Sequence, residues 1–144
     1  MSKLQYSAYP GFGDFAHEVL GYNQAVRIGD KIELSGQGGW LNKSSQVDRP
    51  DLSDFPIPDD IDAQVDQAFA NVDASLKAAG CTGWEQVYRI TAYLAPLTQE
   101  GVDAIVKNLK DWMPYHKPIC TLLGVEKLAL DNMKVEIEVV AYDP

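Results

Sequence analysis

The chain has 144 residues, which is enough for one domain with a buried core. Hydrophobic residues make up 46% of it, yet no apolar run approaches the roughly 20 residues that a membrane-spanning helix needs. Acidic residues outnumber basic ones 21 to 12, and the resulting formal net charge of −9 argues against nucleic acid as a partner. The first residues form neither a basic start with an apolar stretch nor an Arg-rich pattern, so we expect a soluble cytoplasmic protein that does not associate with membranes.

The first elements expected in chain order are strands. The opening through Gly21 is rich in Gly, Pro and aromatic residues and predicts a short edge strand followed by a loop. Apolar residues then alternate with charged ones on both sides of Gly29-Asp30, a pair suited to a tight turn. This pattern predicts two antiparallel, half-buried strands. Their apolar positions are Val26, Ile28, Ile32 and Leu34.

A long loop and a helix are expected next. The stretch from Gly36 to Pro58 is rich in glycine, proline and polar residues, which is typical of a surface loop. Asp59 or Asp60 can cap the helix that follows, and Gly80 lies where a left-handed residue would end it. The apolar residues between these points recur with the helical period. They are Ile61, Val65, Ala68, Phe69, Val72 and Leu76.

The second half of the chain predicts three more strands and one more helix. Residues Gln86 to Leu94 are rich in β-branched and aromatic types and predict a strand. Thr98 can cap a helix with an apolar stripe, and Pro114 ends it. The last strands are expected from Ile119 to Val125 and from Met133 to Tyr142.

Together these elements predict a single α+β domain spanning residues 1–144, with a mixed six-stranded sheet and two helices on one face. The opposite face of the sheet still needs a cover. A subunit interface can supply it.

Four segments, in this order along the chain, carry motifs of one family. They are Gly21–Val26 (GYNQAV), Ile32–Gly39 (IELSGQGG), Gln64–Asn71 (QVDQAFAN) and Val135–Glu138 (VEIE). They are similar to the Gly-x-Tyr-Ser-Gln-Ala, Ser-Gly-Gln, Gln-x-x-Gln-Ala-x-x-Asn and Val/Ile-Glu-Ile-Glu motifs of the RidA/YjgF family. The chain therefore resembles the reactive intermediate deaminases, which are also grouped under the name L-PSP endoribonuclease.

This resemblance implies a chorismate-mutase-like fold and a homotrimer in which three sheets form a central β-barrel. It also implies clefts at the subunit interfaces that bind a small-molecule ligand. Members of the deaminase branch hydrolyse enamines and imines to 2-oxo acids and ammonia, and they need no metal or organic cofactor. The chain's own composition agrees in one respect. Two cysteines and two histidines are too few for a zinc-type cluster within one chain.

The resemblance also marks site residues. Tyr22 and Glu136 match the family's cleft tyrosine and its proton-transferring glutamate. Ser35, Gly36 and Thr121 match residues that line the substrate. A structural alternative stands beside each role: Tyr22 can be a half-buried tyrosine at a strand junction, Ser35 can satisfy backbone groups, and Glu136 can belong to a solvated strand face. Asn108 is only a loose match for the asparagine that some members place near the site, and Trp40 is expected to pack in the interior or line the cleft mouth.

The family's substrate anchor is missing. An arginine in a Pro-x-Arg-Ser/Thr segment binds the substrate carboxylate in the family, and the matching residue here is Cys120, in the sequence Pro118-Ile119-Cys120-Thr121. A thiol is at best one weak donor, whereas a guanidinium is a charged fork. Hydrogen bonds to charged groups are worth about 1.5–3 kcal/mol, so the loss lowers binding roughly 10- to 150-fold. Arg89 or Lys134 could replace the arginine only by reaching in from another strand.

Cys120 itself admits two interpretations. A base or cation close by would activate its thiol as a nucleophile or redox sensor, and His116 is near it in sequence. The other interpretation is a small, buried, apolar residue on a strand. Cys81, beside the helix end at Gly80, is expected to be structural.

The leading hypothesis is a RidA-like hydrolase whose interfacial cleft handles an imine, enamine or related molecule, with ordinary 2-imino acids disfavoured by Cys120. The alternative is a non-catalytic trimer that binds a small ligand or another protein. Ribonuclease activity is disfavoured by the acidic charge and by the absence of a catalytic histidine pair.

Overall fold

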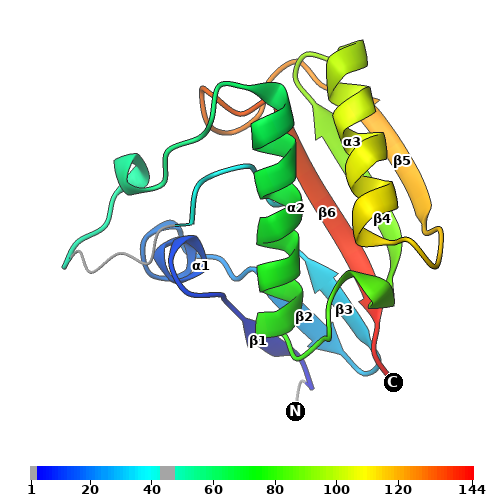
Figure 1. Ribbon diagram of the computed structural model, residues 1–144. Coiled ribbons are helices and arrows are strands. Elements are labelled where there is room, and N and C mark those ends of the chain that lie inside the picture. Colours follow the sequence, from blue (N-terminus) through cyan, green and yellow to red (C-terminus); the bar gives the residue numbers. More distant parts are fainter. Residues whose placement is uncertain (1–2, 43–47) are drawn as a thin grey trace.

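The computed structural model describes residues 3–42 and 48–144 (Figure 1). Its sheet has six strands in the order β1-β2-β3-β6-β4-β5, and only β4 and β5 run parallel. The mixed six-stranded α+β fold is confirmed. The strands are β1 (Gln5–Ser7), β2 (Ala25–Ile28), β3 (Lys31–Leu34), β4 (Val87–Leu94), β5 (Ile119–Gly124) and β6 (Val135–Tyr142). Met1, Ser2 and residues 43–47 of the expected long loop lie outside the described residues.

Two long helices, α2 (Ile61–Ala78) and α3 (Gln99–Trp112), lie side by side over one face of the sheet (Figure 1). They begin at the caps that the sequence predicts. The Asp60 carboxylate accepts from the Ala63 amide at 2.9 Å, and the Thr98 hydroxyl accepts from the Gly101 amide at 3.1 Å. Gly80 follows α2 with a φ of +95°, the left-handed conformation that ends a helix.

The core lies between these helices and the sheet. Phe69 of α2 stacks on Trp84 with ring centroids 4.7 Å apart, and both are buried. Trp84 begins the short 3-10 helix Trp84–Gln86, and its indole donates to the Phe69 carbonyl. The buried strand positions alternate, so one face of β4 and β6 supplies the core. Its residues are Ile90, Ala92, Leu94, Val135, Ile137, Val139 and Ala141.

The opening segment differs from the prediction of a loop after the edge strand. Residues Phe12–Phe15 form the short helix α1, and Ala16–Leu20 continue it as a π-helical turn. Phe12 stacks on Trp40 at 3.8 Å and meets Phe55 edge-on at 5.4 Å. This small aromatic core, with partners 28 and 43 residues away in sequence, orders a segment whose glycines and proline favour a loop. Trp40 is buried in it and packs there, as one of its two expected roles requires.

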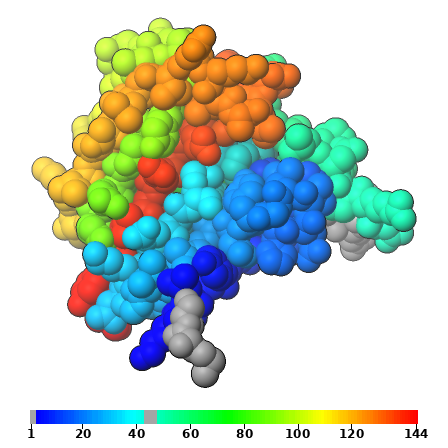
Figure 2. Space-filling view, turned by 180° about the vertical axis from the view of Figure 1, so that it is seen from behind, coloured from blue at the N-terminus to red at the C-terminus, as the bar shows by residue number. Residues whose placement is uncertain are grey.

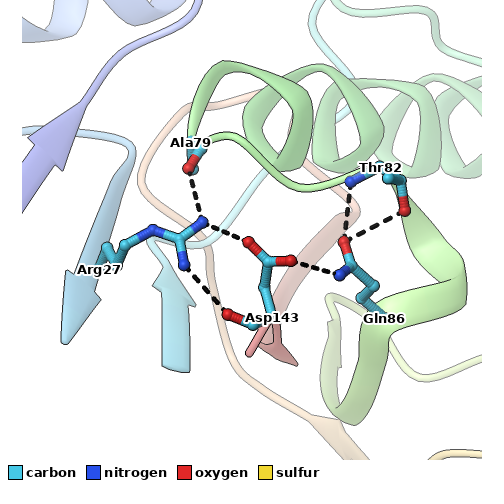
Figure 3. A network of polar contacts seen from close by, with 5 residues as sticks. All are labelled: Arg27, Ala79, Thr82, Gln86 and Asp143. Carbon is cyan, nitrogen blue, oxygen red and sulfur yellow. Dashed lines mark hydrogen bonds and ion pairs between the residues drawn. The ribbon is translucent and has the colours of Figure 1, made fainter. Parts of the chain in front are cut away.

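A polar network fixes the C-terminal end of the chain (Figure 3). The Arg27 guanidinium in β2 binds the Asp143 carboxylate at 2.5 Å and the Ala79 carbonyl at the end of α2 at 3.3 Å. Gln86 donates to the other Asp143 oxygen at 2.6 Å. The hydrogen bond from Arg27, with a second from Gln86, lowers the pKa of Asp143. The network joins the sheet, α2 and the C-terminal residues.

The other face of the sheet is uncovered in the single chain. Seen from behind, red atoms of β6 lie at the surface between green ones of β4 and blue to cyan ones of β2 and β3 (Figure 2). Large apolar side chains on this face are exposed, among them Tyr6 (60%), Ile119 (65%) and Tyr142 (52%). They lie on β1, β5 and β6 and are therefore spread across this face. Within the described residues, none of the helices is long and apolar enough to cross a bilayer.

Candidate functional site

Three of the predicted site residues meet where β3 ends beside β6. Gln37, just after β3, pairs with Ile137 through two backbone hydrogen bonds of 2.8 and 2.9 Å. This pairing sets Gly36 against Glu136. A methyl group added at Gly36 would overlap the Glu136 carboxylate. Glycine at this position therefore lets the carboxylate lie directly over the backbone.

Glu136 is a half-buried carboxyl group, and among the described residues no cation is seen to act on it. Alternation along β6 puts it with Glu138 on the uncovered face, opposite the buried Val135 and Ile137, as the sequence predicts. Burial, and then the negative charge of Glu138, raise the pKa of Glu136. A carboxyl group with a raised pKa can hold and release a proton nearer to neutral pH.

Tyr22 is close enough to this carboxyl group for the charge of Glu136 to act on its hydroxyl. Burial raises the pKa of Tyr22, the Gln24 side chain lowers it, and the charge of Glu136 raises it further. The side chain is 38% exposed, so one part of the ring is covered and another faces solvent. Tyr22, Gly36 and Glu136 thus form one group at the edge of the uncovered face.

Ser35 lies in the same region, but its hydroxyl is occupied. Its Oγ donates to the Asn23 carbonyl at 2.7 Å, and its amide donates to the Gln24 carbonyl at 2.8 Å. In the single chain, Ser35 therefore satisfies backbone groups, the structural role that the sequence left open. It also lines a hollow of about 510 Å³ on the uncovered face, together with Tyr22 and Glu33.

A second hollow, of about 340 Å³, continues across β6 to β4 and β5, and it shares Glu33 and Leu34 with the first. Thr121 lines it, level with Thr91 on the neighbouring strand. Arg89 lines it too. Its guanidinium makes no ion pair within the described part of the chain, so it is a cation available on the face that carries Glu136. Lys134, the other possible substitute for the missing arginine, instead donates to the Asp59 carbonyl.

Cys120 lies on the opposite side of the sheet from these groups. It is level with the buried Ile90 of β4, and Leu122, two residues on, packs against the core. Cys120 therefore points toward the helix side, at the free edge of β5. The expectation of burial is wrong for the single chain, where Cys120 is exposed because β5 is an edge strand. Cys81 is buried, which agrees with the structural role expected of it.

The Cys120 thiol is not activated by its surroundings. Partial burial raises its pKa, which keeps the thiol protonated. The nearby His116 ring instead bonds to the Val87 carbonyl through Nε2, at 2.8 Å. A nucleophilic role for Cys120 gains no support from this geometry.

Asn108, the loose match, is an interior residue. It is buried in α3 and donates to Asp66 at 2.8 Å and to the Ala104 carbonyl at 3.0 Å. The bond to Asp66 joins α3 to α2. Asn108 thus serves the packing of the helices.

Sequence reasoning missed a layer of buried polar residues beneath the site. Asn71 of α2 donates to the carbonyls of Gly38 and Trp40 at 2.8 and 2.9 Å and so holds the loop after β3 in place. Gln24 and Gln37 are also fully buried and bond to each other at 2.7 Å. All three residues lie in the four sequence motifs. Polar residues placed among apolar neighbours are the feature of the sequence that could have identified them as buried hydrogen-bonding groups.

Comparisons with known proteins assign the chain to a family. The model described as Endoribonuclease L-PSP matches residues 16–143. The chain belongs to the L-PSP family, also known as RidA/YjgF. The resemblance drawn from the four motifs is confirmed.

Two similar members span nearly the same length as this RidA/YjgF chain. The RutC family protein YjgH of Escherichia coli K12 is 34% identical over 125 residues, which cover 85% of this chain and 83% of the relative. A RutC family protein of Aquifex aeolicus VF5 is 31% identical over 122 residues, 83% and 86% of the two chains.

Solved structures agree on the fold. A structure of protein YJGH superposes with a TM-score of 0.79 at 26% identity, covering 99% of this chain and 98% of that one. Escherichia coli TdcF with bound serine superposes with a TM-score of 0.73 at 21% identity, covering both chains fully. At 21% identity, the second likeness shows the fold alone.

Proposed function

We propose that this RidA/YjgF member hydrolyses an imine, an enamine or a related small molecule in clefts between the subunits of a homotrimer, without a cofactor. One observation carries the proposal. A half-buried carboxyl group of raised pKa, Glu136, lies over the Gly36 backbone, and its charge acts on the Tyr22 hydroxyl. Such a pair provides a proton donor and acceptor next to a hydrogen-bonding hydroxyl, which is what hydrolysis of a carbon–nitrogen double bond requires.

The proposed chemistry needs no group beyond the chain and water. Protonated Glu136 gives its proton to the imine nitrogen, which makes the adjacent carbon more electrophilic. The carboxylate then accepts a proton from water as the water oxygen bonds to that carbon. The resulting aminoalcohol loses ammonia, so imine and water become a carbonyl compound and ammonia. Tyr22 holds the reacting molecule in position by hydrogen bonding.

The shared cleft rests on the position of Cys120. In one chain, Cys120 points to the helix side at the edge of β5, and Glu136 lies on the opposite face. The two can line one cleft only when the β5 edge of one subunit meets the uncovered face of another. That contact would also cover the exposed apolar residues of this face.

The substrate is proposed to differ from a 2-imino acid. TdcF has been solved with bound serine, an amino acid with a free carboxylate. At the arginine position of the family this chain has Cys120, whose thiol is protonated and offers no charge. A neutral molecule, or an anion bound by Arg89, fits the charges of these residues better.

Cys120 also favours the second candidate function, a trimer that binds a small ligand or a protein and does not catalyse a reaction. A member without catalysis would no longer need the arginine that binds the substrate. The two candidates differ in turnover, so ammonia release separates them.

The test measures ammonia released from 2-iminobutanoate and 2-iminopropanoate generated in situ. We expect slow hydrolysis by the parent chain, faster hydrolysis by Cys120→Arg, and none by Cys120→Arg combined with Glu136→Gln. Arg89→Met tests the other cation in both backgrounds. Parent rates equal to those of an arginine-bearing relative would overturn the role given to Cys120. If Cys120→Arg adds nothing and the parent is inactive, the binding function is favoured.

A further inference from the structure

A chain of four buried side chains runs beneath the site and ends at Gln24. The Trp40 indole donates to the Tyr9 hydroxyl at 2.9 Å, and that hydroxyl donates to Gln37 Oε1 at 2.7 Å. Gln37 Nε2 donates in turn to Gln24 Oε1 at 2.7 Å. All four residues are at most 3% exposed.

The direction of this chain is fixed by groups that have only one hydrogen-bonding role. An indole N–H can only donate, and a backbone carbonyl can only accept. Gln37 Nε2 also donates to the Ser35 carbonyl at 3.0 Å, so the Gln37 amide cannot be reversed. Gln24 must therefore present its oxygen to Gln37, and its amide nitrogen faces the other way.

That nitrogen is buried, yet it has no hydrogen-bond partner within the described part of the chain. A buried donor without an acceptor costs about 1–3 kcal/mol, so a fixed one is expected to serve a purpose. The Tyr22 phenol is within its influence. The Gln24 side chain lowers the pKa of Tyr22, which is the effect of a donor directed at the phenol oxygen.

We propose that Gln24 is a positioning residue that donates its Nε2–H to the Tyr22 hydroxyl oxygen and so directs the Tyr22 O–H into the cleft. Tyr22 then acts as a donor, and the ligand must offer it an acceptor, such as an imine nitrogen or a carbonyl oxygen. This ligand class rests on the proposed function. The Gln24–Tyr22 hydrogen bond does not, because it can be measured without turnover.

Gln64 provides a matched control within the chain. It is also a fully buried glutamine from one of the four motifs. Its Nε2 donates to the carbonyls of Pro58 and Asn132 at 2.8 and 3.1 Å, and its Oε1 accepts from the Lys134 amide at 2.6 Å. Gln64 uses its whole amide to join α2 to the loops around it. Of these two glutamines, Gln24 alone has a side-chain N–H group without an acceptor in the described part of the chain.

The test follows the ¹³Cζ resonance of Tyr22 in chains labelled on tyrosine, with Tyr22→Phe to assign it. Tyr22 is faced by Gln24, Glu136 and Tyr9, and Glu136→Gln separates the carboxylate's effect from that of the amide. We expect Gln24→Met to move the Tyr22 resonance at neutral pH and to raise its titration midpoint. Gln64→Met should leave both unchanged. An unmoved resonance in Gln24→Met, or equal movement in both variants, would overturn the proposal.

A second measurement avoids any change to the buried chain. Tyr22→Phe removes only a hydroxyl from a partly exposed ring, so this variant should fold. It therefore provides a test even if Gln24→Met does not fold. In chains labelled with ¹⁵N on glutamine side chains, Tyr22→Phe should shift the Gln24 NH₂ resonances and leave those of Gln64 in place. Unshifted Gln24 resonances would show that the amide has another partner. If the hydrogen bond is present but no imine is hydrolysed, only the proposed function fails.

Discussion

Gly36→Ala perturbs the site through a single methyl group. The added carbon would lie 2.7 Å from both Cγ and Cδ of Glu136, far inside van der Waals contact. The backbone at Gly36 has no positive φ, so alanine is not strained there by its own conformation. The Glu136 side chain is flexible and must turn away. Leaving its rotamer costs about 0.5–1.5 kcal/mol, which is a modest loss of stability.

The effect on the site should be much larger than the effect on stability. A displaced carboxylate moves out of the half-buried position that raises its pKa, so the pKa of Glu136 should fall toward its ordinary value. A displacement of about 1 Å typically lowers a rate about 100-fold, and the same loss is expected for ammonia release by Gly36→Ala in the Cys120→Arg background.

The assays are urea unfolding, NMR titration of the Glu136 carboxyl carbon, and ammonia release. Gly29→Ala is the control. Gly29 lies in the turn between β2 and β3 with a φ of +61° and no atom near the added carbon. It should lose about 1–2 kcal/mol from backbone strain and change neither the Glu136 titration nor the rate. If Gly36→Ala keeps the parent's Glu136 pKa and rate, then the carboxylate does not act from its position over Gly36.

Three further changes test other parts of the structure. The pKa of Glu136 is higher in the folded chain than in the unfolded one, so the folded chain binds more protons between these two values. The free energy of unfolding should therefore fall as pH rises from the ordinary glutamate pKa through the raised one. Glu136→Gln should remove this pH dependence in urea unfolding measured across that range. Asp143→Asn should lower the Tm at neutral pH. The difference from the parent should shrink as pH falls through the lowered pKa of Asp143, because the parent's carboxylate is then protonated and its pairing with Arg27 is lost as well. Asn71→Ala leaves two buried carbonyls without a donor and should cost about 2 kcal/mol in urea unfolding, whereas a change at an exposed asparagine, Asn132→Ala, should cost less.

Local patterns predicted most of the fold because they are set by neighbouring residues. Alternation around Gly29-Asp30 identified β2 and β3, and the caps at Asp60 and Thr98 marked the starts of α2 and α3. The helix at Phe12–Phe15 was missed because its order comes from contacts with Trp40 and Phe55. Such contacts between distant segments leave no periodic signal in the sequence.

The site could be predicted in part. The motifs placed Tyr22, Gly36 and Glu136, and the structure brings these residues together. The face on which Cys120 lies depends on the register of β5 against β4, which spacing along the chain does not specify. The unused donor of Gln24 was also beyond sequence reasoning, because it follows from the direction of a hydrogen-bond chain through Gln37.

The proposed function depends on a cleft between subunits, because Cys120 and Glu136 lie on opposite faces of one chain's sheet. Its most direct test is the mass of the purified protein in solution, measured by light scattering over a range of concentrations. A mass three times that of the 15.9 kDa chain is predicted. A mass of one chain at every concentration would contradict it and leave Glu136 on an open surface.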